Sequence, residues 1–337
     1  MKKYVALLLA LCMVFALCAC GQKDEPTVSD DANAPAATDT NTVAVGAVVI
    51  ARDDVPEDEI YAFVSTIFEN TDEIATQHGK GAELDLEFAS SITSVPYHPG
   101  AAKYFEEKNM EVASVKEGAG TGTAGALTFT TGGETGTYYG FGGVLASYVS
   151  SNTEYSVTAV TSGGSKANIE DMMAGNAQLG FVQSDVMSYA YNGERLFEEK
   201  LDGFSVVAAL YMEQVQIVTT NPEIQSVADL EGKIVSIGDI GSGVYFNAVD
   251  VLGAYDLTEA DISPVYQGFG DSAESLKDGK IDAAFVVAGA PTTAITDLAT
   301  AGSVYLVSLD EEHTANLLAS SPYYSEAVIA ADTYSGK

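Results

Sequence analysis

The sequence predicts an α/β protein of two lobes, each a sheet with helices on both faces. The first observation is that short apolar runs alternate with helical stretches from Leu127 onward. The second is that two strand-to-helix junctions are glycine-rich turns, at 130–139 and 238–244. The third is length, because the roughly 300 residues that follow a polar N-terminal segment are enough for two separate cores.

The first residues, 1–20, predict a lipoprotein signal peptide. A basic start precedes Tyr4–Ala19, which is apolar but short for a membrane span. Residues 17–21 (LCACG) resemble the bacterial lipobox, and on that resemblance Cys20 receives lipid and becomes the first mature residue. An ordinary signal peptide cut nearby is the alternative. Since Cys12 and Cys18 leave with the signal, we expect no second thiol and no disulfide framework in the mature chain.

Composition limits the partners. Residues 21–41 are rich in Asp, Ala, Thr and Pro, and predict a disordered tether. The formal net charge of -33 excludes nucleic acid as a plausible partner. Arg52 and Arg195 are the two arginines of the chain, so an arginine clamp for an anion is excluded and backbone N–H groups are the expected donors.

The apolar runs predict the strands in order. They are Leu127–Thr130, Tyr155–Val160, Leu179–Val182, Val206–Leu210, Val215–Thr219, Ile234–Ile237, Ser263–Tyr266, Ala283–Val287 and Val304–Leu309. Because helical stretches separate most of them, we expect parallel strands. Ligands of such sheets bind at the carboxyl ends of the strands, where both glycine turns fall.

Each glycine turn predicts an anion-binding helix start, because the first helical N–H groups have no intrahelical partner and the helix dipole is positive there. The candidate contacts are Thr135, Gly136, Thr137, Tyr138 and Tyr139 in one lobe, and Gly241, Ser242, Gly243 and Val244 in the other. The alternative is that both are tight turns in which glycine supplies a positive φ. Two such turns facing one another would form a small-molecule clamp.

Further candidates follow the other strands. Ser162, Gly163 and Gly164 could offer hydroxyl and backbone donors, whereas Lys166 beside them is expected to be a surface lysine. Gln183 could point into the cleft, and Ser184 could cap the next helix.

Two more candidates lie in the predicted second lobe. Gln214 is either a ligand contact or a hinge hydrogen-bonding group. Phe285 is expected to wall the pocket.

A series of motifs in register resembles the solute-binding subunits of the TAXI class of TRAP transporters. They are Thr131–Tyr139, Ser162–Ser165 with Asn168, Leu179–Asp185, Ala208–Tyr211 with Val215–Ile217, Gly241–Gly243, and Asp282–Gly289. The resemblance implies a two-lobed, type II periplasmic-binding-protein-like fold that carries a small carboxylate, such as glutamate, to an ion-gradient-driven TRAP permease. Together with the lipobox-like residues 17–21, it predicts an extracytoplasmic monomer held at the cell membrane by its lipid.

The order of the motifs indicates a circular permutation. Residues 42–115 resemble the C-terminal portion of the family, yet they precede a Gly-rich linker at 116–126, a first lobe at 127–212 and a second lobe at 213–325. The last segment, 326–337, is then a crossover back towards the first lobe. Permutation predicts that Val43–Ile50 lies near Ala327–Ala331. The alternatives are a separate small domain at 42–115 and an error of sequence assembly.

The remaining polar residues argue against catalysis. His78, His98 and His313 stand apart from any Cys, Ser or acidic residue at metal or nucleophile spacing, and no Gly-x-Ser-x-Gly elbow or P-loop occurs. We therefore expect no catalytic residue, no metal and no cofactor. A sensory lipoprotein that presents solute to a membrane kinase is the second hypothesis, and a secreted enzyme is the least supported.

Overall fold

The computed structural model describes residues 38–123 and 125–334. The predicted signal peptide, Cys20 and nearly all of the predicted tether lie outside the described residues. The first strand, β1, begins at Thr40, just before the expected end of the tether at residue 41. The described residues all belong to one compact unit.

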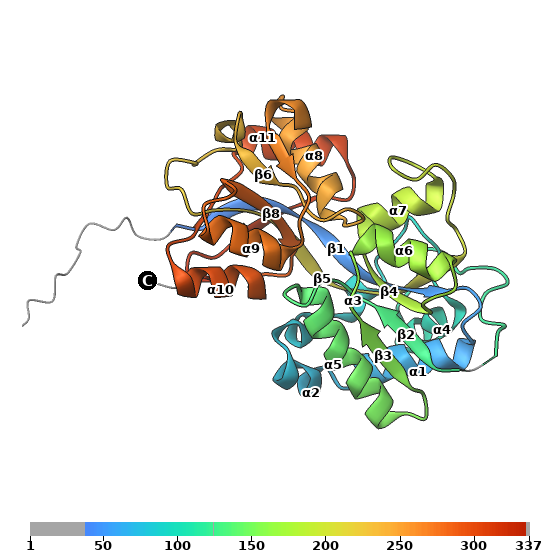
Figure 1. The fold of residues 1–337 in the computed structure, drawn as a ribbon. Helices are drawn as coiled ribbons and strands as arrows, with labels where there is room; N and C mark the ends of the chain where they lie inside the picture. The colour runs from blue at the N-terminus through green and yellow to red at the C-terminus, as the bar shows by residue number, and fades with distance from the viewer. Residues whose placement is uncertain (1–37, 124, 335–337) are drawn as a thin grey trace, which may run out of the picture. The chain divides into compact units, whose positions relative to one another are not determined.

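The described chain forms a ten-stranded sheet in the order β3-β2-β4-β1-β5-β8-β6-β7, with β10 beside β1 and β9 beside β5 (Figure 1). The strands are β1 (Thr40–Arg52), β2 (Leu127–Thr130), β3 (Val157–Val160), β4 (Leu179–Gln183), β5 (Phe204–Thr219), β6 (Ile234–Ser236), β7 (Ser263–Val265), β8 (Ala283–Ala288), β9 (Tyr305–Leu306) and β10 (Ser325–Ile329). The α/β class is confirmed. The expectation of parallel strands holds for β2 with β3 and β4 and for β6 with β7 and β8, whereas β1 and β5 pair antiparallel with their neighbours.

Strand β5 corrects one prediction. The runs Val206–Leu210 and Val215–Thr219, predicted as two strands, are parts of a single strand of 16 residues. The four residues between them, 211–214, include neither Gly nor Pro. They stay in the strand because they pair with β1, from Tyr211 opposite Ala47 to Gln214 opposite Ala44. Pairing with a second long strand therefore keeps residues 211–214 extended, although their sequence pattern predicts a loop there.

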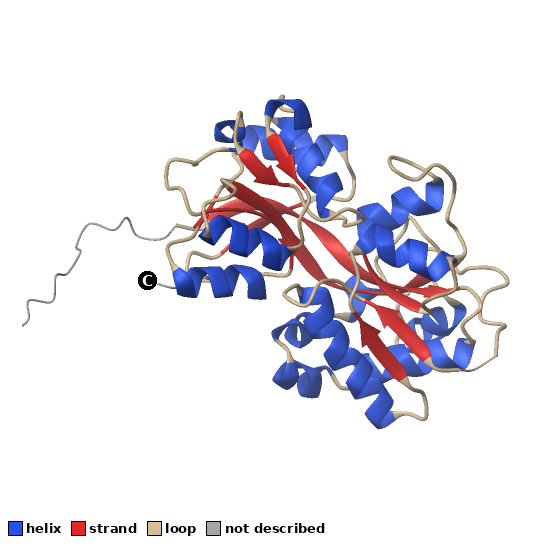
Figure 2. Cartoon of the chain, viewed as in Figure 1, coloured by secondary structure: helices blue, strands red, loops and turns tan. Residues whose placement is uncertain are grey.

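Helices cover both faces of the sheet (Figure 2). They are α1 (Glu57–Phe68), α2 (Thr71–Gln77), α3 (Leu86–Ala89), α4 (Pro99–Glu107), α5 (Thr137–Asn152), α6 (Ser165–Met173), α7 (Ser184–Asn192), α8 (Val244–Ala254), α9 (Phe269–Lys277), α10 (Thr293–Ala301) and α11 (Glu311–Ser320), with short 3-10 turns η1 (Gly79–Glu83), η2 (Val227–Leu230) and η3 (Glu259–Asp261). Helices α1 and α2 are separated at Asn70, which leaves the helical region at φ -132° and ψ 33° while its side-chain amide donates to Thr66 O at 2.8 Å.

Two large apolar cores divide the chain into a first and a second lobe, and both long strands contribute to each. The first core includes Ala47–Ala51 of β1 and Val206–Tyr211 of β5. The second includes Val43, Val45 and Val215. The strands thus pass from one core to the other at about Gly46 and Glu213, which is where the lobes join.

A stack of aromatic rings leads from the first core to this junction. Phe181 on β4 stacks between Phe129 and Tyr138, with ring centroids 5.0 Å and 4.7 Å away. Phe63 of α1 meets Phe129 edge-on. Such pairs add to the apolar burial, and they fix Tyr138 at the start of α5.

The two ends of the described chain lie side by side. Strand β1 pairs antiparallel with β10, so that Val43 faces Glu326 and Thr42 faces Ala327. The residues opposite Ala327–Ile329 are 40–42, so of the expected segment Val43–Ile50 only its first two residues pair with β10, opposite Glu326 and Ser325. Residues 42–115 do not form a separate domain. Strand β1 pairs with β4 and β5, and the fully buried Phe63 and Phe105 belong to the first core.

The glycine-rich linker follows the protein surface closely. Gly120 donates its N–H to Asp53 O at 2.8 Å and accepts the N–H of Glu57 at 3.1 Å. Gly125 donates to Glu59 Oε1 at 2.8 Å. Gly120 has φ of +81°, a conformation that glycine tolerates, and this lets the linker lie along the start of α1.

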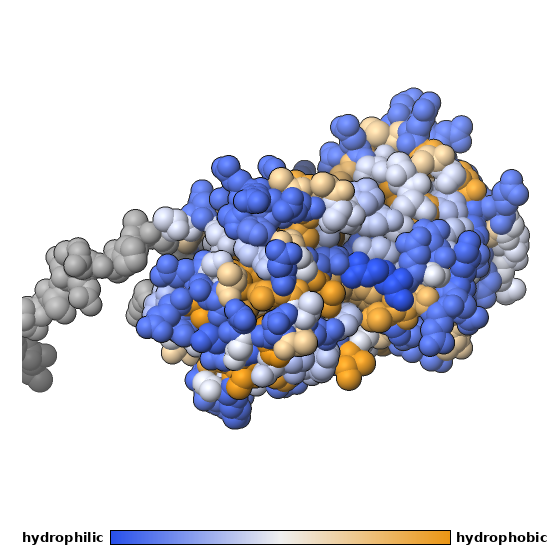
Figure 3. All heavy atoms as spheres, turned by 90° about the horizontal axis from the view of Figure 1, so that it is seen from above, coloured by the Kyte–Doolittle hydropathy of each residue, from blue (hydrophilic) through white to orange (hydrophobic). Residues whose placement is uncertain are grey.

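Hydrophilic residues cover most of the face drawn in Figure 3, and apolar residues show between them. Within the described part of the chain, no helix combines the length and the apolar character that a membrane span requires.

Candidate functional site

A cavity lies where the parallel strands of both lobes end. Its space for water-sized molecules is about 90 Å³. The lining residues come from the loops and helix starts that follow β2, β3, β6 and β7, from the ends of β4 and β8 and from the middle of β5: Gly132, Gly133, Gly136, Thr137, Tyr138, Ser162, Gly163, Gly164, Ser165, Gln183, Glu213, Asp239, Ser242, Gly243, Val244, Gly268, Phe269, Val287 and Ala288. This is the position in which α/β sheets bind ligands.

Four helices begin at this cavity. Helices α5 and α6 belong to the first lobe and start at Thr137 and Ser165, whereas α8 and α9 belong to the second and start at Val244 and Phe269. Among the described residues, the N–H groups of these four residues have no hydrogen-bond acceptor. Converging helix starts supply positive potential and free donors without a cationic side chain.

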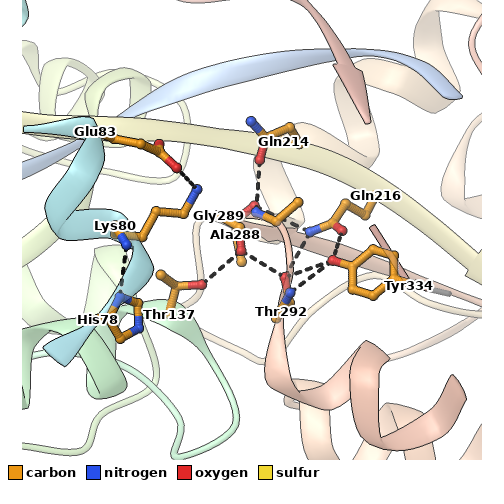
Figure 4. A network of polar contacts seen from close by, with 11 residues as sticks. His78, Lys80, Glu83, Thr137, Gln214, Gln216, Ala288, Gly289, Thr292 and Tyr334 are labelled. Atoms are coloured by element: carbon orange, nitrogen blue, oxygen red, sulfur yellow. Dashed lines mark hydrogen bonds and ion pairs between the residues drawn. The ribbon is translucent and has the colours of Figure 1, made fainter. Parts of the chain in front are cut away.

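The lobes are closed over the cavity. Ala167 N–H of α6 donates to Gly241 O across the gap at 3.0 Å, and Ala294 N–H donates to Thr135 O at 3.2 Å. The Thr137 hydroxyl donates to Gly289 O at 3.0 Å (Figure 4). Each bond joins a first-lobe residue to a second-lobe residue, so opening the cavity requires all three to break.

Two buried polar atoms of the lining lack a partner. Gln183 Oε1 on the first lobe and Ser242 Oγ on the second are both buried and form no hydrogen bond with the described residues. A buried polar atom without a partner costs about 1–3 kcal/mol. A polar solute in the cavity would remove this cost, and it would do so from both lobes at once.

The charged lining residues are acidic. Glu213 is 2% exposed, and its Oε2 accepts a hydrogen bond from the Tyr138 hydroxyl at 2.7 Å. Burial raises the pKa of Glu213 to about 8, although the Tyr138 hydrogen bond opposes this change. Asp239 is exposed at the edge and accepts the N–H of Ile240.

Two basic side chains, Arg52 and Lys166, pair with acidic residues away from the cavity lining. Arg52 binds Asp54 with Nε to Oδ1 at 2.5 Å, and Lys166 binds Glu170 on its own helix. Neither Arg52 nor Lys166 lines the cavity.

Most of the predicted contact residues meet at the cavity. Those that line it are Gly136, Thr137, Tyr138, Ser162, Gly163, Gly164, Gln183, Ser242, Gly243 and Val244. The prediction that the two glycine turns face one another from opposite lobes therefore agrees with the structure. Whether these residues bind a ligand stays a prediction.

The other predicted contacts lie outside the lining. Thr135 and Gly241 offer their carbonyl groups to the other lobe, as described above. Ser184 Oγ accepts Gly46 N–H at 3.1 Å, and Ser184 is the first residue of α7 rather than its cap. Tyr139 is half-buried beside the cavity, and Phe285 is 1% exposed inside the second core rather than on the pocket wall.

Gln214 belongs to a network beside the cavity (Figure 4). Its Oε1 accepts Ala290 N–H at 2.9 Å. Next to it, Gln216 Nε2 donates to Thr292 Oγ1 at 2.9 Å, and the Tyr334 hydroxyl donates to Gln216 Oε1. These bonds fix the segment after β8, and Gln214 and Ala290 both belong to the second lobe. Gln214 is not among the lining residues, and its role as a hinge or ligand group stays a prediction.

Sequence reasoning missed Glu213, Asp239, Ser165 and Phe269. Glu213 could have been found from the sequence, because it is the one acidic residue in the apolar run from Phe204 to Thr219. Phe269 gave none, since it resembles any apolar residue at a helix start. Within the described residues, no group of His, Cys, Asp and Glu side chains is arranged to hold a metal ion.

The chain belongs to the NMT1-like family, whose model matches residues 25–108 and 129–337.

Solved structures that resemble it include the periplasmic aliphatic sulphonate-binding protein SsuA of Escherichia coli, at 18% identity and a TM-score of 0.35 over 55% of this chain and 60% of that one. Another is the alkanesulfonate-binding SsuA of Xanthomonas axonopodis pv. citri bound to MOPS, at 17% identity and a TM-score of 0.38 over 56% of this chain and 62% of that one. The amino acid ABC transporter substrate-binding protein AbpA of Streptococcus pneumoniae bound to L-arginine matches at 16% identity and a TM-score of 0.37 over 55% of this chain and 76% of that one. The chain thus spans about three fifths of the two sulfonate-binding proteins.

Gly243→Ala tests the packing of the two lobes at the cavity. Gly243 has φ of -72°, which alanine adopts freely, but an added Cβ would overlap Gln183 Oε1. Displacing this amide should weaken solute binding by about ten- to a hundredfold, the worth of one charge-assisted hydrogen bond. Calorimetry with the co-purified solute measures the loss.

Gly143→Ala is the matched control, because a Cβ there meets open space on α5. It should leave affinity unchanged and raise helix stability by about 0.5–1 kcal/mol. Undiminished affinity of a folded Gly243→Ala protein would show that this turn plays no part in binding.

Proposed function

We propose that this protein is an extracytoplasmic solute-binding receptor that captures a small carboxylate between its lobes and delivers it to a membrane permease. The observation that carries the proposal is the convergence of four helix starts from both lobes on one closed cavity. Backbone N–H groups at helix starts bind anions without arginine. The unpartnered Ser242 Oγ adds a hydroxyl that can donate to a carboxylate, whereas the unpartnered Gln183 Oε1 is an acceptor that a solute N–H or O–H would satisfy.

The mechanism follows from the position of the cavity. In an open form, solute would bind to one lobe, and closure would complete the contacts from the other. The three interlobe hydrogen bonds that close the cavity involve backbone carbonyls and therefore report on closure rather than on the identity of the solute. The permease would then recognise the closed form.

The sequence motifs support the TAXI class of TRAP transporters as the permease system. The same motifs support a circular permutation, with residues 42–115 as the displaced C-terminal portion. The pairing of β1 with β10 fits this proposal, because Thr40 lies opposite Ile329 and the two ends could be joined by a short loop. The lipobox-like residues 17–21 support a lipid anchor on Cys20.

The first test is native mass spectrometry of gently purified protein, followed by calorimetry with the small molecule it reveals. We expect a carboxylate in a one-to-one complex. A protein that neither co-purifies with a small molecule nor is stabilised against melting by any of a panel of carboxylates would contradict the proposed function.

A second test rebuilds the unpermuted order. A chain that runs from 127 to 334, then through a short loop into 39–115, keeps the β1–β10 pairing and the packing of Phe63 and Phe105. It should fold and bind the same solute, because surface connections tolerate cutting. A rebuilt chain that is insoluble or unfolded by circular dichroism would count against permutation.

A third test concerns the anchor. Cys20→Ser should abolish incorporation of labelled lipid and release the protein from the membrane fraction. Cys18→Ser is the control and should change neither. Lipid labelling that persists in Cys20→Ser would refute the lipobox assignment.

A further inference from the structure

Glu213 is the one acidic residue of strand β5, and it is buried where the two lobes join. It lies on β5 opposite Val45 of β1, at the point where the chain passes from one core to the other. Its side chain is 2% exposed and lines the cavity. A carboxyl group is therefore held between two apolar cores and turned to the place where a solute would bind.

Within residues 38–123 and 125–334, no cationic side chain pairs directly with this carboxyl. The described titratable groups around it are Tyr138 on α5, Tyr211 on β5, Asp185 on α7 and Lys80 on η1. Lys80 Nζ binds Glu83 Oε1 at 2.6 Å and lies 5.3 Å from the centre of the Tyr211 ring. Asp185 adds a second buried acid rather than a counter-charge.

An ionised Glu213 would be costly here. Burial without a direct ion pair favours the neutral acid, and this raises the pKa of Glu213 to about 8, with Asp185 raising it further while Tyr138 and Lys80 oppose the change. At neutral pH the group is therefore a protonated carboxylic acid. Such an acid donates a hydrogen bond, as buried neutral carboxylic acids do in some enzyme sites.

The hydrogen bonding of Glu213 leaves its proton free for a solute. The Tyr138 hydroxyl donates to Oε2 at 2.7 Å, and among the described residues Oε1 has no hydrogen-bond partner. With the proton on Oε1, the O–H is a donor to the cavity. An ionised Glu213 would instead place a negative charge beside the anion, in a cavity whose other charged lining residue, Asp239, is also acidic.

We propose that protonated Glu213 donates a hydrogen bond to the anionic solute, so that the protein captures its solute only while it holds this proton. The inference rests on the proposed function, since it assumes that the solute is a carboxylate. In this role Glu213 selects solutes that carry a hydrogen-bond acceptor, and it makes the affinity for the solute depend on pH.

The linkage has a definite sign. A carboxylic acid with a raised pKa keeps its proton to higher pH, so anion affinity should be constant below about pH 8 and fall above it. The fall approaches about tenfold for each pH unit while the bound form stays protonated. A solute ammonium bound to ionised Glu213 would give the opposite trend, with affinity rising as the group loses its proton.

The first measurement needs no ligand. Carbon-13 NMR of protein labelled at the glutamate carboxyl carbons follows each acid through pH, and Glu213→Gln identifies the resonance by its loss. We expect a midpoint near pH 8. Tyr138→Phe keeps the stacking on Phe181 but removes the donor to Oε2, so it should move the midpoint to higher pH. A Glu213 that is ionised at neutral pH overturns the inference.

The second measurement is calorimetry with glutarate and L-glutamate between about pH 6.5 and about pH 9. The two probes carry the same carboxylates and differ in the ammonium. We expect wild-type affinity to fall above pH 8, whereas Glu213→Gln, a neutral donor, should bind within a few-fold of wild type without this fall. Asp239→Asn removes a charge at the cavity edge and should keep the pH dependence.

The outcomes separate the inference from the proposed function. Binding that stays constant across the range while NMR shows Glu213 losing its proton overturns the inference and leaves the receptor function standing. Affinity for L-glutamate that rises as Glu213 ionises overturns it in favour of ammonium recognition. If neither these probes nor any carboxylate of the panel binds while Glu213 is protonated, the proposed function fails and the inference fails with it.

Discussion

The antiparallel pairing of β1 with β5 is the constraint on which the rest of the structure depends. Both strands are long enough to serve two cores, so the lobes share one continuous ladder instead of a flexible linker. The carboxyl ends of the parallel strands in each lobe then face the same space. A polar residue at the crossover is buried by both lobes together, which is why Glu213 lies at the cavity rather than in solvent.

The same constraint explains how charge is handled at the site. The chain is strongly acidic, yet no basic side chain is among the residues that line the cavity. Helix starts supply partial positive charge that needs no counter-ion, and Gly243 and Gly164 let the two lobes approach closely at those starts. Glu213 fits this arrangement because burial keeps it neutral, so it can serve as a donor where a carboxylate would oppose an anion.

The contacts across the cavity are of two kinds. The backbone carbonyls of Gly241, Gly289 and Thr135 accept hydrogen bonds from the opposite lobe, and they hold the closed form. Gln183 Oε1 and Ser242 Oγ have no partner in that form. Closure also pairs side chains of the two lobes, Asn247 with Asp185 and Arg195 with Asp250, so the two unpartnered lining atoms are side-chain groups that it leaves for a solute.

The sequence by itself determined the α/β class, most strand positions and the two glycine turns, because apolar period and glycine placement are local properties of the chain. Tertiary structure alone decided that Val206–Leu210 and Val215–Thr219 form one strand, since pairing with β1 outweighs the polar residues between them. It also decided that Phe285 lies in a core and that Glu213 faces the cavity. Which face of a strand meets a cavity depends on the register with its neighbours, and register is fixed by contacts between residues far apart in the chain.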